Sequence, residues 1–244
     1  MRQRLLLLSL IGAVALAVLP AQVFAGDCVA PISWGTTYAY ESNYANYVSN
    51  AGSQLTLVGT VNCFNSMFDD IDPNAGVEYS VYVFGLSSQG TVVTPIPPVN
   101  QTAYQTAYDG GTVQIWEDPT PDAVFTDNPP NAEVPSTFSD GSLFLEGNLE
   151  GLNVTFFLWT ADNSFASGNF DSGWPAGAVW TGGSHFDRVN LGGEGCPLRL
   201  TGGWNVTPSA LPTGYTADVE GKIDIDCPTQ AEAGSWGELK GLYR

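Results

Sequence analysis

The feature that most limits the fold is the division of the chain into short runs of strand-forming residues. Residues 54–63, 77–84 and 153–159 are rich in β-branched and aromatic side chains, and apolar residues alternate along 77–84. Glycine, proline, asparagine and aspartate separate the runs, and no long segment of helical periodicity lies between them. This spacing favours antiparallel sheets over a βαβ arrangement.

Further strands are expected at residues 112–116, 143–146, 178–181, 198–201 and 215–225, and the connection 147–152 predicts a hairpin. Residues 40–48 are rich in tyrosine and fit a short helix or a loop. Residues 118–135 carry many prolines and fit a linker or a long loop. We therefore predict one antiparallel β-sandwich, Ig-like or jelly-roll-like, over residues 26–230, with two smaller β domains as the alternative.

The first 25 residues have the order of a secretory signal peptide. A short positive start precedes an apolar run at 5–19, and small residues end at Ala25. The run is shorter than the roughly 20 residues of a membrane-spanning helix. We expect cleavage after Ala25 and a secreted protein (extracellular, periplasmic or cell-surface) with no transmembrane segment.

Four cysteines follow the signal peptide, namely Cys28, Cys63, Cys196 and Cys227. An even number in an exported chain predicts disulfides. Pairing of near neighbours favours Cys28–Cys63 and Cys196–Cys227, although the other pairings stay open. Zinc is disfavoured because no Cys-x-x-Cys spacing occurs and the chain has one histidine.

The charge balance excludes nucleic acid as a partner. The chain has 25 acidic and 7 basic residues, a net charge of −18, whereas affinity for phosphates comes largely from Lys and Arg. An extracellular protein or glycan is the expected partner. The acidity also fits solubility, or carboxylates that bind divalent cations.

One acidic loop has the composition of a Ca²⁺ site. Asp69, Asp70, Asp72, Asn74 and Glu78 place oxygen ligands at short intervals, as Ca²⁺ requires. The spacing departs from an EF-hand loop at the positions of its glycine and its bidentate glutamate. Ca²⁺ is therefore a predicted cofactor, and turn formation alone is the alternative.

Two tryptophans and the single histidine are the remaining candidates for a binding or catalytic site. Trp174 and Trp180 bracket a Gly/Pro-rich stretch and predict a sugar-stacking surface, with core packing as the alternative. In an extended chain His185 and Asp187 share a face while Ser184 points away, so no catalytic triad is expected. No catalytic residue is nominated, and the chain is predicted not to be an enzyme.

The C-terminal residues 231–244 predict a short helical tail. Ser235 and Glu238 form a capping box. Residues 236–244 read Trp-Gly-Glu-Leu-Lys-Gly-Leu-Tyr-Arg. They resemble a tail, Trp-Gly-x-Ile/Leu-Lys-x-Leu-Tyr-Arg, shared by uncharacterised secreted bacterial proteins. The resemblance covers only these nine residues and implies a sorting or attachment tag; a helical turn docked on the sandwich is the alternative.

Together these features predict a secreted, non-enzymatic, extracellular or cell-surface protein of the structural or adhesion type, stabilised by calcium. A carbohydrate-binding module is the first alternative. A secreted glycoside hydrolase is less favoured, because acidic residues are so abundant that some carboxylate pair is expected by chance.

Overall fold

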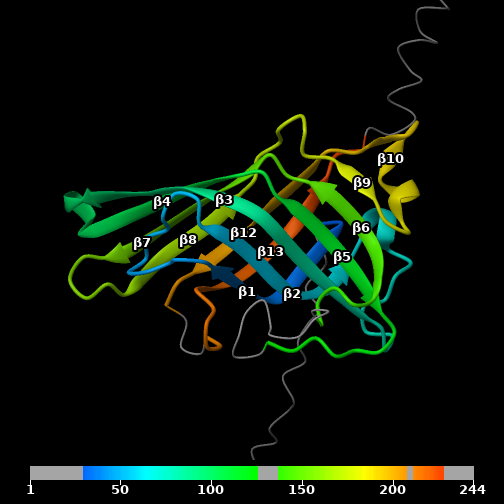
Figure 1. The fold of residues 1–244 in the computed structure, drawn as a ribbon, viewed down its shortest axis with the longest axis horizontal. Helices are drawn as coiled ribbons and strands as arrows, with labels where there is room; N and C mark the ends of the chain where they lie inside the picture. Colours follow the sequence, from blue (N-terminus) through cyan, green and yellow to red (C-terminus); the bar gives the residue numbers. More distant parts are fainter. Residues whose placement is uncertain (1–29, 126–136, 208–210, 228–244) are drawn as a thin grey trace, which may run out of the picture.

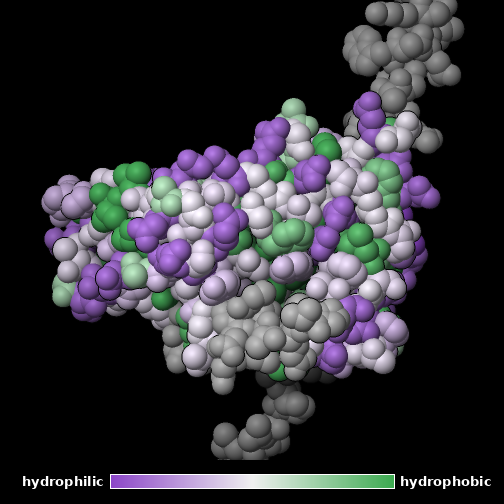
Figure 2. All heavy atoms as spheres, in the orientation of Figure 1, coloured by the Kyte–Doolittle hydropathy of each residue, from purple (hydrophilic) through white to green (hydrophobic). Residues whose placement is uncertain are grey.

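The computed structural model describes residues 30–125, 137–207 and 211–227 (Figure 1), and hydrophilic residues are spread over much of the face shown in Figure 2. All strand pairings among them are antiparallel, which confirms the predicted all-β sandwich class. The predicted signal peptide and C-terminal helix lie outside these ranges. The strands are β1 (Ile32–Glu41), β2 (Gln54–Phe64), β3 (Glu78–Ile96), β4 (Gln101–Asp109), β5 (Thr112–Asp118), β6 (Ser142–Asn148), β7 (Gly151–Trp159), β8 (Phe165–Asp171), β9 (Trp180–Gly182), β10 (Asn190–Leu191), β11 (Glu194–Gly195), β12 (Leu198–Asn205) and β13 (Ala217–Ile225).

The main sheet has the strand order β2-β1-β13-β12-β8-β7-β4-β3-β5-β6-β9. Because β2 also pairs with β3, the first eight strands of this order form a closed ladder. Strands β5, β6 and β9 continue from β3, while β10 and β11 form a separate small hairpin. Short 3₁₀ turns occupy η1 (Ser66–Phe68), η2 (Pro97–Val99) and η3 (Phe186–Arg188).

Strand β3 is long enough to take part in both layers. Its first half pairs with β5, from Glu78↔Asp118 to Phe84↔Thr112. Its second half pairs with β4, from Ser87↔Asp109 onward. In Figure 1 the β3–β4 hairpin extends beyond the body of the fold together with β7 and β8.

The layers are joined at a corner where consecutive strands bend together. The Gly110 N–H donates to the Glu150 carbonyl oxygen at 3.0 Å, and the Leu149 N–H donates to the Gly111 carbonyl oxygen at 2.9 Å. Gly110 and Gly111 have φ of 70° and 119°, values that glycine adopts without a steric cost. Strand pairs that change layer at such a bend are typical of sandwiches with crossed strands.

The predicted hairpin at residues 147–152 is wrong for the same reason. β6 pairs with β5 and β9, whereas β7 pairs with β4 and β8. The two strands are thus successive parts of one bent path, and they belong to different layers. Glycine and asparagine around the bend gave a turn signal that is shared by hairpins and corners.

The core lies between the layers and is rich in aromatic rings. Phe144 is fully buried and packs against Phe64, Phe68 and Tyr79 at ring-centroid distances of 5.5, 5.6 and 5.5 Å. On β12, Leu198, Leu200 and Trp204 point inward, and the residues between them stay exposed or half-buried. This alternation leaves the outer face of that layer for polar side chains.

Several strands were not predicted, and one ambiguous segment is settled. β1, β4, β8 and the second half of β3 were missed, whereas the remaining predicted strands match β2, β5, β6, β7, β9, β12 and β13. Residues 42–53 form turns and an isolated bridge rather than a helix. Asn43, Asn46 and Tyr47 have φ of 59°, 52° and 67° there, values that interrupt any helix.

Cys196 and Cys227 form a disulfide with a Cα–Cα distance of 5.0 Å, which confirms the pair favoured by their spacing. The bond ties the chain just before β12 to the chain just after β13. Cys63 is also disulfide-bonded, and Cys28 lies outside the described residues. Among the residues that the structure describes, no helix has the length and apolarity needed to cross a bilayer.

Candidate functional site

The outer side of one layer, from β4 across β7, β8, β12 and β13 to β1, carries a band of mainly polar residues, here called the polar face. Strand pairing aligns its residues in two rows that cross the strands. None of the residues in either row is buried. The first row is Ala107, Asn153, Asp171, Thr201, Lys222 and Ser33, and the second is Gln105, Thr155, Asn169, Gly203 and Glu220.

The rows form an extended polar surface rather than a single deep pocket. Neighbouring strands lie about 4.8 Å apart, so five strands in a row span roughly 20 Å. The side chains along each row carry hydroxyl, amide or charged groups, and small residues lie between them. Such a surface presents both hydrogen-bond donors and acceptors at regular intervals.

Four shallow grooves lie on the polar face. The first has a volume of about 500 Å³ and lies between Gln105 and Asn153. The second, about 350 Å³, contains Asp171, Arg199, Lys222 and Asp224. The third, about 440 Å³, is here called the Gly203 groove, and the fourth, about 360 Å³, adjoins it through Gly203 and Glu220. The Gly203 groove is lined by Phe165, Ala166, Ser167, Gly168, Gly203, Trp204, Asn205, Asp218 and Glu220.

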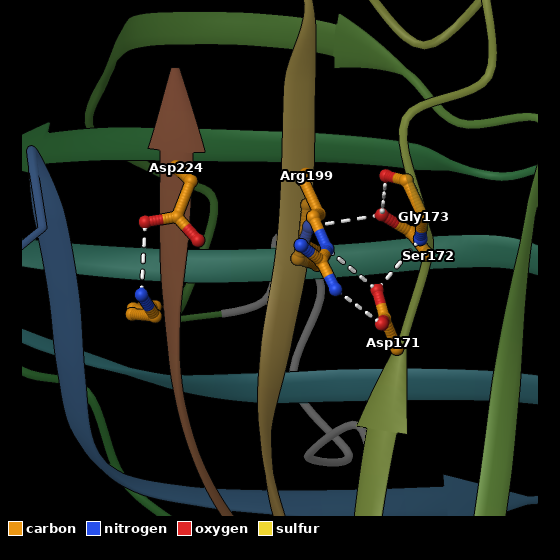
Figure 3. Close-up of polar contacts among 7 residues, drawn as sticks. Asp171, Ser172, Gly173, Arg199 and Asp224 are labelled. Carbon is orange, nitrogen blue, oxygen red and sulfur yellow. Dashed lines mark hydrogen bonds and ion pairs between the residues drawn. The ribbon is translucent and has the colours of Figure 1, made fainter. Parts of the chain in front are cut away.

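A carboxylate–guanidinium pair lies at the centre of the polar face (Figure 3). Arg199 Nε donates to Asp171 Oδ1 at 2.8 Å, and Nη2 of the same guanidinium contacts Oδ2. The Gly173 N–H donates to the same Oδ1 at 2.7 Å. The hydrogen bond from Arg199 holds the pKa of Asp171 below its usual range. Ser172 Oγ accepts from the Leu200 N–H at 2.9 Å, so the end of β8 is fixed to β12.

A second ion pair lies beside the first on β13. Lys222 Nζ lies 3.0 Å from Asp224 Oδ1, and Asp224 is paired in register with Arg199 of β12. In Figure 3 both pairs lie over strands of the other layer, which run across them from behind. These partly exposed pairs contribute little to stability, but they keep donors and acceptors positioned on the surface.

The two predicted ligand-binding tryptophans lie in different environments. Trp174 is 46% exposed in the loop that follows β8, three positions after Asp171. Trp180 is 1% exposed, lies in β9 and packs in the core. The structure therefore corrects the prediction for Trp180, because a buried ring has no free face for a sugar. Trp174 stays a candidate near the polar face.

The five predicted calcium ligands do not converge on one point. Both oxygens of Asp70 contact the guanidinium of Arg188, with Nη2–Oδ2 at 2.8 Å, and this bonding lowers the pKa of Asp70. Asp72 Oδ1 accepts from the Asn74 N–H at 2.9 Å, as in an ordinary turn. Asp69 is exposed and belongs to no carboxylate cluster of the described chain.

Glu78 does belong to a carboxylate cluster, with partners that were not predicted. Oxygens of Glu78, Asp118 and Asp122 lie within 4.8 Å of one another. Asp118 is 8% exposed, and its Oδ1 accepts from the Thr120 N–H and hydroxyl, both at 2.8 Å. Burial chiefly raises the pKa of Glu78, and the neighbouring aspartates add to the rise. Only the pairing of β3 with β5 reveals this cluster, since no local motif joins its members.

His185 has a neighbour that the extended-chain argument excluded. Ser184 Oγ lies 3.0 Å from His185 Nδ1, because the chain turns into η3 here instead of staying extended. The imidazole stacks on Phe144 at 4.1 Å, and burial lowers its pKa. Asp187 contacts Asn190 instead. Within the described part of the chain no carboxylate hydrogen-bonds to the ring, so the third member of a triad is not assembled.

No protein family, no curated protein and no solved structure matches this chain.

Proposed function

We propose that this chain is an exported, non-enzymatic protein of the extracellular or cell-surface adhesion type that binds an extended partner across the polar face. The main support for this proposal is that two rows of polar residues and four adjoining grooves lie on the same side of the sandwich. A flat, regularly spaced surface of this kind suits a polymer better than a small molecule, which requires a concave and mostly apolar site.

Export is supported by the signal-like first 25 residues and by the Cys196–Cys227 bond. Disulfides persist in oxidising compartments and are rare in the cytosol. A non-enzymatic role is supported by two carboxylates at the centre of the polar face. The carboxylates of Asp171 and Asp224 are held in ion pairs with Arg199 and Lys222, which suits fixed recognition more than proton transfer.

Calcium stays part of the proposal, at a revised position. Three carboxylates whose oxygens lie within 4.8 Å repel one another, and a divalent cation would offset that repulsion. The Glu78–Asp118–Asp122 cluster is therefore the place in the described chain where added Ca²⁺ is expected to stabilise the fold.

The test is retention of the fluorescent mature protein on surfaces coated with extracellular-matrix proteins or polysaccharides. We expect saturable retention that is lost in Asn169→Arg, because an arginine at the centre of the second row obstructs the face. Ser142→Arg is the matched control, since Ser142 is exposed at the start of β6, outside the polar face. The proposal fails if no surface retains the protein, or if Asn169→Arg is retained like the control.

A further inference from the structure

The Gly203 groove has a composition unlike the rest of the polar face. Phe165 and Trp204 supply its apolar part, and Trp204 is buried beneath the surface at 4% exposure. Ser167, Asn205, Asp218 and Glu220 supply the polar part. No lysine or arginine lines the groove, although both types line the groove of about 350 Å³ beside it.

The groove lies at the one position of the second row that has no side chain. Gly203 lies between Asn169 and Glu220 in register. A Cβ built on Gly203 meets no atom within 4 Å, so close packing does not explain a glycine there. Both adjoining grooves, of about 440 and 360 Å³, include Gly203 and Glu220, and an added side chain would fill the space they share.

The polar groups of the groove are hydrogen-bond acceptors with spare capacity. In the described part of the chain, the side chains of Ser167, Asp218 and Glu220 make no hydrogen bond. Ionised carboxylates accept hydrogen bonds but donate none. Their shared negative charge repels an anionic ligand, while a ligand rich in hydroxyl groups satisfies them.

We propose that the Gly203 groove is a sugar-binding subsite for a neutral glycan chain lying along the two rows of the polar face. The sugar ring packs against Phe165, and its hydroxyls donate to Asp218 and Glu220. Further along the chain, Arg199 and Lys222 donate to sugar oxygens. This inference rests on the proposed binding function and names the ligand class and the subsite.

The mixed charges separate a neutral glycan from other polymers. A polyanion is repelled by Asp218 and Glu220 in the Gly203 groove. A basic peptide is repelled by Arg199 and Lys222 in the adjoining groove. A neutral sugar chain both donates and accepts hydrogen bonds, so it matches both grooves. The half-buried ring of Phe165 beside acceptor groups fits a sugar ring with one apolar side and several hydroxyls.

The test measures depletion of the mature protein by insoluble cellulose, chitin, mannan and β-1,3-glucan, with alginate beads and oligolysine resin as charged probes. We expect saturable binding to at least one neutral polysaccharide. Gly203→Leu should weaken this binding at least tenfold, because the leucine occupies the groove. Gly182→Leu is the matched control, since a Cβ at Gly182 in β9 also meets no atom within 4 Å.

A second variant separates the carboxylates from the shape of the groove. Asp218→Asn with Glu220→Gln keeps the side-chain volumes and should weaken neutral-glycan binding several-fold. The inference is overturned if no neutral polysaccharide binds, if Gly203→Leu binds like Gly182→Leu, or if a charged probe binds more tightly and Gly203→Leu weakens that binding. If the protein is retained on matrix-coated surfaces but on no neutral glycan, the subsite proposal alone is wrong. Retention on no surface would defeat the proposed function as well.

Discussion

Glu41, at the end of β1, carries a buried carboxyl that should make the fold more stable in acid. The residue is 4% exposed. Tyr108 Oη donates to Oε2 at 2.9 Å, and Ser49 Oγ donates to Oε1. Ser49 Oγ also lies 2.5 Å from Ser88 Oγ, which extends the buried polar network to β3. Burial chiefly raises the pKa of Glu41, although the bonds from Ser49 and Tyr108 oppose the rise.

The groups that surround Glu41 do not supply a compensating positive charge. Tyr44, whose hydroxyl is buried without a hydrogen-bond partner, approaches from the following turn, and Tyr108 approaches from β4. The described lysine and arginines are paired with other carboxylates. Folding therefore favours the protonated form of Glu41 over the ionised form.

The sign of the pH dependence follows from the raised pKa. A carboxyl with a higher pKa in the folded state than in the unfolded state, where it is about 4.3, binds its proton more tightly when folded. Its contribution to stability is complete below the unfolded pKa and is lost as pH rises through the folded pKa. Between these limits the free energy of unfolding falls by about 1.4 kcal/mol per pH unit. For a domain of this size that is a fall in Tm of roughly 3 to 5 °C per pH unit.

Glu41→Gln tests this reasoning by replacing the carboxyl with a neutral group of the same shape. Urea and thermal unfolding between pH 4 and 9 should show that the variant gains stability relative to wild type as pH rises. Glu194→Gln, at an exposed position in β11, should track wild type. The reasoning fails if Glu41→Gln and wild type keep the same stability difference across this pH range.

Three further predictions concern the core, the disulfide and calcium. Phe144→Ala should cost about 3 to 5 kcal/mol in urea unfolding, because the fully buried ring leaves a cavity; a loss under 1 kcal/mol would contradict the packing. Replacing Cys196 and Cys227 by serine should cost about 3.7 kcal/mol, the closure entropy for a separation of 31 residues, and an unchanged urea midpoint would refute it. Calcium at a hundredfold excess over its dissociation constant should stabilise by about 2.7 kcal/mol and raise Tm by roughly 5 to 10 °C. Asp118→Asn should abolish this rise in Tm. A Tm that changes with neither chelator nor calcium would contradict a calcium site at this cluster.

The strands that the sequence predicts are those whose two faces differ in polarity. In β3 the residues Val81 and Val83 face the core, and the run 77–84 shows this as an alternation. β4 reads Gln-Thr-Ala-Tyr-Gln-Thr-Ala-Tyr-Asp and buries Thr106 and Tyr108. Its inward face is therefore made of residues that are also common in loops. Such a strand is specified by its neighbours more than by its own periodicity.

The polar face is a consequence of register, which a single sequence does not contain. Asn153, Asp171, Thr201 and Lys222 are separated by long intervals of chain, but pairing places them in one row. A shift of one residue in any of these pairings would turn that strand's polar side chains into the core. The apolar residues Leu198 and Leu200 therefore fix the register and, with it, the position of Arg199 beside Asp171.

The dependence on strand register also explains why the predicted sites and the sites in the structure consist of different residues. Ligands close together along the chain predict sites at the acidic loop 69–78 and at the tryptophans 174 and 180. In the structure Arg188 binds Asp70, and the core takes up Trp180. Gly203 shows the opposite case, because a glycine in a strand normally indicates close packing or a bulge. Here its Cβ position is open, so close packing against a neighbour does not account for this glycine.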